Sequence, residues 1–246
     1  MPGLLTHTEA RRLLAGFLWP KNLPKKWFLL GLDLLFPPRC AGCGRVDVSW
    51  CSVCAFALAS VPLTLSLRNL DDNIAVVSTG VHIDWLQRAV QALKYEQLTL
   101  LQVPLGARLI DGLNQLDWPV DLIVPVPLSQ ERLRTRGYNQ AQLLAEEVAA
   151  AHGIPHVPAA IQRVRYTHSQ VGLNLAERRA NVKDAFVADA GIVAGKTVLL
   201  IDDVCTTGST LSACAQAALQ AGARKVYGLT VTTPHPQALL PNLLSL

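Results

Sequence analysis

Residues 198–210 read Val198-Leu-Leu-Ile-Asp-Asp-Val-Cys-Thr-Thr-Gly-Ser-Thr210, and this stretch decides the fold. An apolar run typical of a buried strand leads into two adjacent carboxylates, and a loop rich in hydroxyls then opens a helical pattern. In open α/β sheets, ligands bind at the carboxyl ends of the strands, where the next helix begins. The stretch therefore predicts a parallel sheet with a ligand site at its edge.

The loop after the two aspartates has the composition of a phosphate site. A helix N-terminus offers free amide hydrogens and a partial positive charge. Gly208 allows close approach of the backbone, and hydroxyl donors come from Thr206, Thr207, Ser209 and Thr210. Two carboxylates beside a phosphate indicate that the ligand also presents hydroxyls or a metal ion, and a ribose 5-phosphate fits both halves. The alternative is a capped helix with solvent-facing aspartates.

Short apolar runs alternate with amphipathic runs along the rest of the chain. Strands are predicted at Ile74–Val81, Asp121–Pro127, Thr197–Ile201 and Val226–Val231, and helices at Trp85–Tyr95, Leu98–Leu113, Asn139–Ala151 and Ser209–Ala221. Pro104 either kinks the second of these helices or marks its start. The alternation predicts an α/β fold whose parallel sheet is covered by helices on both faces.

Four of the six cysteines form two C-x-x-C pairs, Cys40 with Cys43 and Cys51 with Cys54. Two such pairs this close suit tetrahedral thiolate coordination of Zn²⁺, and because the protein fills all four positions the ion is expected to be structural. We expect Gly42 and Gly44 to supply the positive φ angles of a metal-binding turn. The alternative is a pair of local disulfides or redox pairs, which a cytoplasmic setting disfavours.

The other two cysteines have different expected roles. Cys214 falls in a helical pattern and is expected to be a small buried hydrophobe. Cys205 lies in the loop after the aspartates, where a nucleophilic role is the alternative to a structural one.

Composition sets limits on the class of protein. Half of the 246 residues are hydrophobic and 16% are charged, which excludes a disordered or coiled-coil chain. The net charge of +4 is too small to establish nucleic-acid binding, but residues 1–45 and 131–183 are each basic and could meet an anion or simply face solvent. No apolar run reads as a membrane span, so we expect a cytoplasmic protein without a membrane partner.

We divide the chain into three parts. Residues 1–26 form a basic N-terminal extension, residues 27–60 hold the four-cysteine zinc-binding module, and residues 61–246 form the α/β domain.

The loop resembles the PRPP-binding loop of the type I phosphoribosyltransferases, which has the form hydrophobic-Asp-Asp-x-x-Thr-Thr-Gly-x-Thr. The chain is similar above all to the ComF family, which joins an N-terminal four-cysteine zinc module to a phosphoribosyltransferase-like domain. Besides the loop, the likeness is carried by residues 35–43, Leu93-Lys-Tyr95, Val124-Pro-Val-Pro127, residues 132–140, residues 163–167, Gln170 and residues 177–181. It covers roughly residues 30–233.

The resemblance implies a role for each matching residue. Asp202 and Asp203 would hold the ribose hydroxyls of PRPP, and Thr206, Thr207, Gly208, Ser209 and Thr210 would cradle its 5-phosphate. In the pyrophosphate loop, Arg132 and Arg136 are better candidates than Arg134. Gln170, Arg178 and Arg179 would lie on a mobile loop that closes over the site, and Mg²⁺ would accompany PRPP.

Two main functions and one weaker alternative remain open from the sequence. The first is a transferase that moves phosphoribosyl from PRPP to an unidentified acceptor with release of pyrophosphate, with Asp202, Asp203, Arg132 and Arg136 as the catalytic set. The second, implied by the resemblance, is a non-catalytic sensor of PRPP or a nucleotide that handles single-stranded DNA, or meets DNA-processing proteins, in natural transformation. A third is that the zinc module docks a protein partner. Acceptor specificity is expected in residues 61–118, whose pattern identifies no acceptor.

Overall fold

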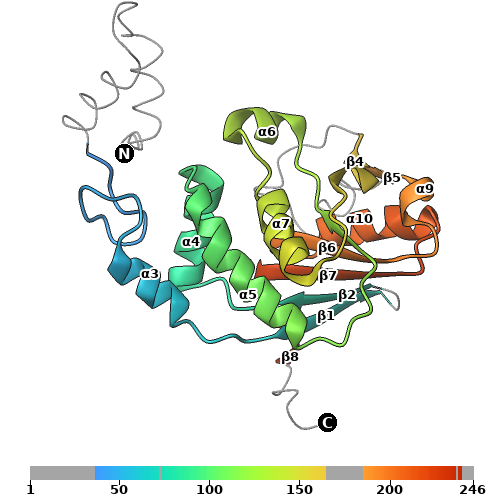
Figure 1. Cartoon of the computed structure of the whole chain (residues 1–246), viewed down its shortest axis with the longest axis horizontal. Coiled ribbons are helices and arrows are strands. Elements are labelled where there is room, and N and C mark those ends of the chain that lie inside the picture. The colour runs from blue at the N-terminus through green and yellow to red at the C-terminus, as the bar shows by residue number, and fades with distance from the viewer. Residues whose placement is uncertain (1–36, 72–73, 165–184, 237, 240–246) are drawn as a thin grey trace, which may run out of the picture.

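The computed structural model describes residues 37–71, 74–164, 185–236 and 238–239, and its centre is a mostly parallel six-stranded sheet (Figure 1). The strand order is β3-β6-β7-β2-β1-β8. The strands are β1 Ser66–Asp71, β2 Ile74–Ser78, β3 Leu122–Pro125, β6 Thr197–Val204, β7 Lys225–Thr232 and β8 Ala238–Leu239. Strands β3, β6, β7 and β2 run parallel, whereas β1 and β8 are antiparallel to their neighbours. The predicted α/β fold with a parallel sheet is confirmed, with an antiparallel edge added.

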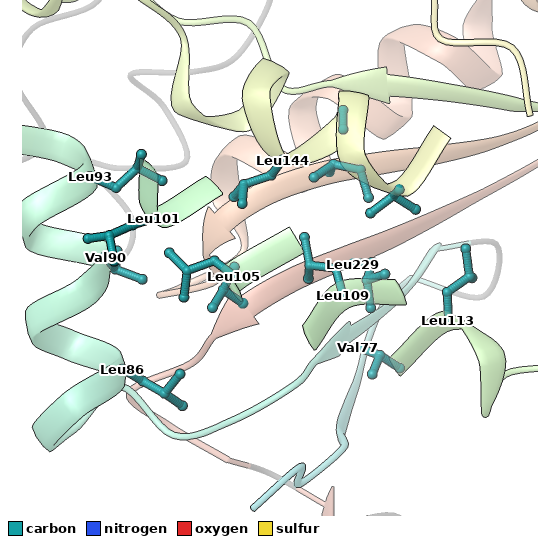
Figure 2. Close-up of a cluster of buried hydrophobic side chains, with 14 of the residues drawn as sticks. Val77, Leu86, Val90, Leu93, Leu101, Leu105, Leu109, Leu113, Leu144 and Leu229 are labelled. Atoms are coloured by element: carbon teal, nitrogen blue, oxygen red, sulfur yellow. The ribbon is translucent and has the colours of Figure 1, made fainter. Parts of the chain in front are cut away.

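Helices cover both faces of the sheet, as the alternating pattern predicts. One face carries α4 (Asp84–Tyr95), α5 (Gln102–Asn114) and α7 (Gln140–His152), whose leucines and valines form the larger core (Figure 2). The other face carries α10 (Ser209–Gln220) and a second core. Pro104 is the third residue of α5, so it marks the start of that helix and does not kink it.

Smaller elements surround this framework. They are α3 (Ser52–Ala59), the 3₁₀ turn η1 (Thr99–Leu101), α6 (Gln130–Arg136), the 3₁₀ turn η2 (Pro158–Ala160), the two-stranded sheet of β4 (Ile161–Arg163) with β5 (Phe186–Ala188), and α9 (Ala190–Val193). None of the helices in the described residues combines the length and the apolar character that crossing a membrane requires.

Strand β6 runs further than the apolar pattern indicates. Asp202 pairs with Thr230 and Val204 with Thr232 of β7, so the strand extends to Val204 and includes both aspartates. Successive side chains of a strand point to opposite faces of the sheet. Leu199 and Ile201 belong to the larger core and Leu200 to the second one. Asp203 therefore lies on the face of α4, and Asp202 on the face of α10.

Candidate functional site

The two adjacent aspartates, which we call the couplet, have different surroundings. Asp203 is 2% exposed, and its Oδ1 lies 2.7 Å from Nζ of Lys94 at the end of α4. Its Oδ2 is buried without a hydrogen-bond partner among the described residues. Asp202 is partly exposed, accepts the backbone N–H of Asp203 at 2.9 Å, and lines a pocket at the start of α10. One carboxylate thus pairs with a cation, and the other faces the pocket.

The protonation of Asp202 follows from this arrangement. Burial raises the pKa of Asp202 to about 7, and the nearby charge of Asp203 contributes to the rise. The positive charges of Lys94 and Arg136 oppose it. Near neutral pH the couplet therefore carries less than two full negative charges.

The bend between β6 and α10 gathers the predicted phosphate-binding residues around one pocket. The pocket is lined by Asp202 and by residues 204–211. Gly208 immediately precedes α10 with a φ of +78°, which is the left-handed region that favours glycine. Thr207 Oγ1 lies 2.8 Å from Ser209 Oγ and accepts the Ser209 N–H at 3.3 Å. Hydroxyls and a helix N-terminus therefore converge beside one carboxylate.

Cys205 and Cys214 lie in this region as buried thiols. Burial raises the pKa of Cys205 to about 11 and that of Cys214 well above its usual value. Both are protonated at neutral pH, and a thiol is a poor nucleophile in that form. The structure favours the structural role for both residues.

A residue from the antiparallel strand β1 holds the bend in place. Arg68 in β1 donates one hydrogen bond to the carbonyl oxygen of Thr206 at 2.6 Å and another to that of His235 at 2.8 Å. The sequence analysis missed Arg68, because no local pattern marks a residue whose contact lies 138 positions along the chain.

The three arginines of the predicted pyrophosphate loop lie on α6 and differ in exposure and in the groups on which their charges act. Arg136 is partly buried, donates to Gln140 Oε1, and places its guanidinium carbon 5.4 Å from the centroid of the Tyr95 ring. Its charge also acts on Asp202. Arg132 and Arg134 are exposed, and the charge of Arg132 acts on Arg163. Of the three, Arg136 is the one whose charge reaches the couplet. Gln170, Arg178 and Arg179 lie outside the described residues.

The four cysteines form a compact cluster whose sulfur atoms all lie within 4.8 Å of one another. The Sγ–Sγ distances are 3.6 Å for Cys40 and Cys54, 3.7 Å for Cys43 and Cys51, and 3.4 Å for Cys51 and Cys54. All four are free thiols. Four sulfurs at these separations can hold one metal ion, and the alternative of two local disulfides is not what the structure shows.

Only one of the two glycines at the first C-x-x-C turn has the positive φ angle that we predict for both. Gly44 has a φ of +79°, as expected, but Gly42 is not among the residues with positive φ. The prediction for Gly42 is wrong: a Cβ at this position would lie 2.6 Å from Cys54 Sγ and 3.2 Å from Trp85 Cζ3. Gly42 is required for space, because the cluster and α4 approach its backbone closely.

Comparisons with known proteins identify relatives of this chain. The family model of the phosphoribosyl transferase domain matches residues 133–240. DNA utilization protein YhgH of Salmonella typhimurium is 35% identical over 198 residues, which cover 76% of this chain and 85% of that protein. Competence protein F of Haemophilus influenzae is 29% identical over 79% of each chain. The chain belongs to the ComF family.

The solved structures similar to this ComF protein are distant. Adenine phosphoribosyltransferase from Trypanosoma brucei is 13% identical, with a TM-score of 0.40, over 69% of this chain and 86% of that one.

Within this ComF protein, Lys94 is a second site residue, besides Arg68, to which the sequence gives no role. It lies within Leu93-Lys-Tyr95, one of the segments that carry the resemblance to the ComF family. A lysine in the last turn of a helix is also explained by the helix dipole alone, which is why the pattern did not single it out.

The cysteine module of the ComF protein packs against the helix that carries Lys94. Trp85 of α4 contacts the buried cysteines together with Trp50. Arg88 donates to the carbonyl oxygen of Gly42 and lies 5.0 Å over the Trp85 ring. Figure 1 shows α3, which begins directly after Cys51, beside α4. The amino-terminal half of α4 therefore holds the module, and its last turn reaches the couplet.

Proposed function

We propose that this protein binds PRPP between the couplet and the bend and transfers its phosphoribosyl group to an acceptor. Asp202 and Asp203 would accept hydrogen bonds from the ribose hydroxyls, and residues 206–210 would hold the 5-phosphate. The observation that carries the proposal is that Asp202 lines the same pocket as the whole hydroxyl-rich bend. A ligand with a phosphate at one end and a diol at the other matches that combination.

The transfer step needs charge stabilisation more than a nucleophile. The bond from the ribose C1 atom to the pyrophosphate oxygen breaks with its electron pair leaving on pyrophosphate, and the acceptor's lone pair forms the new bond to C1. Arg136 is the arginine that we assign to the leaving pyrophosphate, because its fork of donors matches phosphate oxygens and its charge already reaches the couplet. Mg²⁺ enters with PRPP as part of the substrate, and we assign the two carboxylates to hydroxyls and not to the metal.

We further propose that the four cysteines hold a structural Zn²⁺. Zn–S bonds of about 2.3 Å in a tetrahedron separate the sulfurs by about 3.8 Å, close to the distances of 3.4 to 3.7 Å found between three pairs. The backbone N–H of Cys51 also points at Cys40 Sγ at 3.3 Å, which stabilises a thiolate there. Since the cytoplasm keeps such thiols reduced, we place the protein in that compartment.

The test of the main proposal is calorimetry with PRPP and Mg²⁺, followed by a screen of acceptors for pyrophosphate release. Binding should disappear when Asp202→Asn is combined with Asp203→Asn. Asp117→Asn, an exposed aspartate that precedes β3 at the opposite end of the parallel strands, is the matched control and should bind like the wild type. Equal binding by the double variant and the control would refute the assignment. Zinc content, compared between the wild type and Cys40→Ser, tests the metal.

A second candidate function is favoured by the names of the relatives. Proteins called Competence protein F and DNA utilization protein support a role in which PRPP or a nucleotide is sensed while single-stranded DNA is handled. This candidate predicts PRPP binding without pyrophosphate release for any acceptor. It also predicts a salt-dependent affinity for single-stranded DNA whose slope decreases in Arg178→Ala/Arg179→Ala. An unchanged slope would count against those two arginines.

A further inference from the structure

The ion pair of Lys94 and Asp203 is not explained by the contacts assigned to PRPP. The side chain of Lys94 is 19% exposed and that of Asp203 is 3% exposed, and Nζ lies 2.7 Å from Oδ1. Oδ1 of Asp203 is thus held by a positive charge, whereas its Oδ2 has no hydrogen-bond partner among the described residues. Asp202, one residue away, receives a backbone hydrogen bond but no ion pair among the described residues. The two carboxylates are therefore electrostatically unequal before any ligand binds.

Neighbouring elements keep the end of α4 in place. The Tyr138 hydroxyl donates to the carbonyl oxygen of Leu93, directly before Lys94. Gln97 donates from its side chain to the Arg136 carbonyl oxygen at 3.2 Å, and the Arg136 guanidinium lies over Tyr95. These contacts on both sides of Lys94 tie the last turn of α4 to the α6–α7 connection. The backbone from which the Lys94 side chain reaches Asp203 is therefore held by packing.

The charged and titratable groups around the couplet are few. The groups whose charges interact with it are Lys94 from α4, Arg136 from α6, His82 from the segment after β2, Cys205 from the bend and Cys214 from α10. His82 is hydrogen-bonded to Thr232 Oγ1 at 2.8 Å, and burial together with the charge of Lys94 lowers its pKa. Both thiols are protonated near neutral pH. Lys94 and Arg136 are thus the cations whose charges act on Asp202, and the charge of Arg68 from β1 acts on Cys205 in the bend. Of these three in the described site, Lys94 is the one that forms an ion pair with a couplet carboxylate.

We propose that Lys94 is a positioning residue, which gives the two carboxylates of the couplet different roles in binding the ligand. It engages Oδ1 of Asp203, so that the unpartnered Oδ2 is the oxygen left to accept a hydrogen bond from a ribose hydroxyl. Asp202, which faces the pocket of the bend and has no ion pair among the described residues, is the carboxylate left to the rest of the ligand. The identity of the sugar ligand rests on the proposed function, but the effect of Lys94 on the couplet is a property of the ligand-free protein.

The direct test is a titration of the aspartate carboxyl carbons by NMR in the full ligand-free chain. Signals are assigned with Asp202→Asn and Asp203→Asn. Loss of the cation in Lys94→Met should move the upper titration of the couplet to a pH that is higher by about 1–3. Lys94→Arg keeps a charge and should titrate like the wild type, and Lys196→Met, at an exposed lysine before β6, should change nothing. A couplet that titrates at the same pH in Lys94→Met and in the wild type would overturn the proposal.

Two additions keep the test decisive. If Lys94→Met does not fold, as judged by circular dichroism, Lys94→Gln removes the charge while preserving a polar side chain and carries the same expectation. PRPP calorimetry from acidic to neutral pH then connects the titration to function: the pH at which affinity is half lost should rise in the charge-removing variant. When affinities are compared at one pH below that midpoint, a midpoint higher by one in pH weakens binding about tenfold. Failure of the wild type to bind PRPP would refute the proposed function, whereas an unchanged NMR titration would refute the role of Lys94.

Discussion

Gly208 is the position of the bend between β6 and α10 where a single methyl group has the clearest expected effect. Its φ of +78° lies in the left-handed region, which costs an L side chain roughly 1–2 kcal/mol. A Cβ there would also lie 2.6 Å from Leu70 Cδ2, a separation at which the Leu70 side chain must shift, and 3.1 Å from Cδ1, which is a tight contact. Gly208→Ala should therefore lower the free energy of unfolding by about 1–2 kcal/mol from the backbone, plus a steric contribution from Leu70, and should displace the bend.

The two contributions can be separated with a double-mutant cycle followed by urea unfolding. Leu70→Ala removes the clash but not the backbone strain, so the double variant should be less destabilised than the sum of the single variants. Gly195→Ala is the matched control, because its φ is +72° and its Cβ would meet no atom within 4 Å. That control should show the backbone cost alone and bind ribose 5-phosphate normally, whereas Gly208→Ala should bind it more weakly by calorimetry. Strict additivity in the cycle, or unchanged ligand affinity in Gly208→Ala, would refute this reasoning.

Further predictions concern protonation and the metal. The folded pKa of Asp202, about 7, lies above its value in an unfolded chain, so the folded state binds more protons between about pH 4 and about pH 7. Unfolding free energy should fall as pH rises through this window, and Asp202→Asn should reduce that slope in urea titrations at several pH values; an identical slope would contradict the pKa. Cys54→Ser should lower the zinc content and the melting temperature of the module. A chelator should do the same to the wild type but should have no further effect on metal-free Cys54→Ser, and a module that melts unchanged after complete zinc removal would contradict a structural metal.

The fold could be predicted where local pattern and burial agree. Strands that are buried on both faces read as continuous apolar runs, and for this reason the cores of β3, β6 and β7 are recognised from sequence. The end of β6 is set by the pairing of Asp202 with Thr230 and of Val204 with Thr232 on β7. Because the two aspartates are polar, the apolar pattern in the sequence stops before this end. Strand β1, with the sequence Ser66-Leu-Arg-Asn-Leu-Asp71, shows no clear alternation and forms because β2 offers an antiparallel edge.

The same distinction applies to the site. Residues 206–210 are contiguous, so their chemistry could be inferred without knowing the fold. The partners that make the site unequal come from elsewhere: Arg68 reaches the bend from β1, and Lys94 reaches Asp203 from α4. The sequence shows only that the two aspartates are adjacent. Because side chains alternate along β6, their carboxylates lie on different faces of the sheet. Spacing along the chain shows which groups are present, and topology decides which of them act on each other.

Helix α4 connects these observations. Its first turns are fixed to the cysteine module through Trp85 and Arg88, and its last turn carries Lys94 to the couplet. The helix spans only 12 residues, about 18 Å, and it is packed against the larger core along its length through Leu86, Val90 and Leu93 (Figure 2). Such a packed helix shifts as a unit. Disorder in the module would therefore change the position of Nζ of Lys94. If the proposed metal orders the module, it would therefore help to position Lys94 at the other end of α4, although no cysteine of the module contacts the couplet among the described residues.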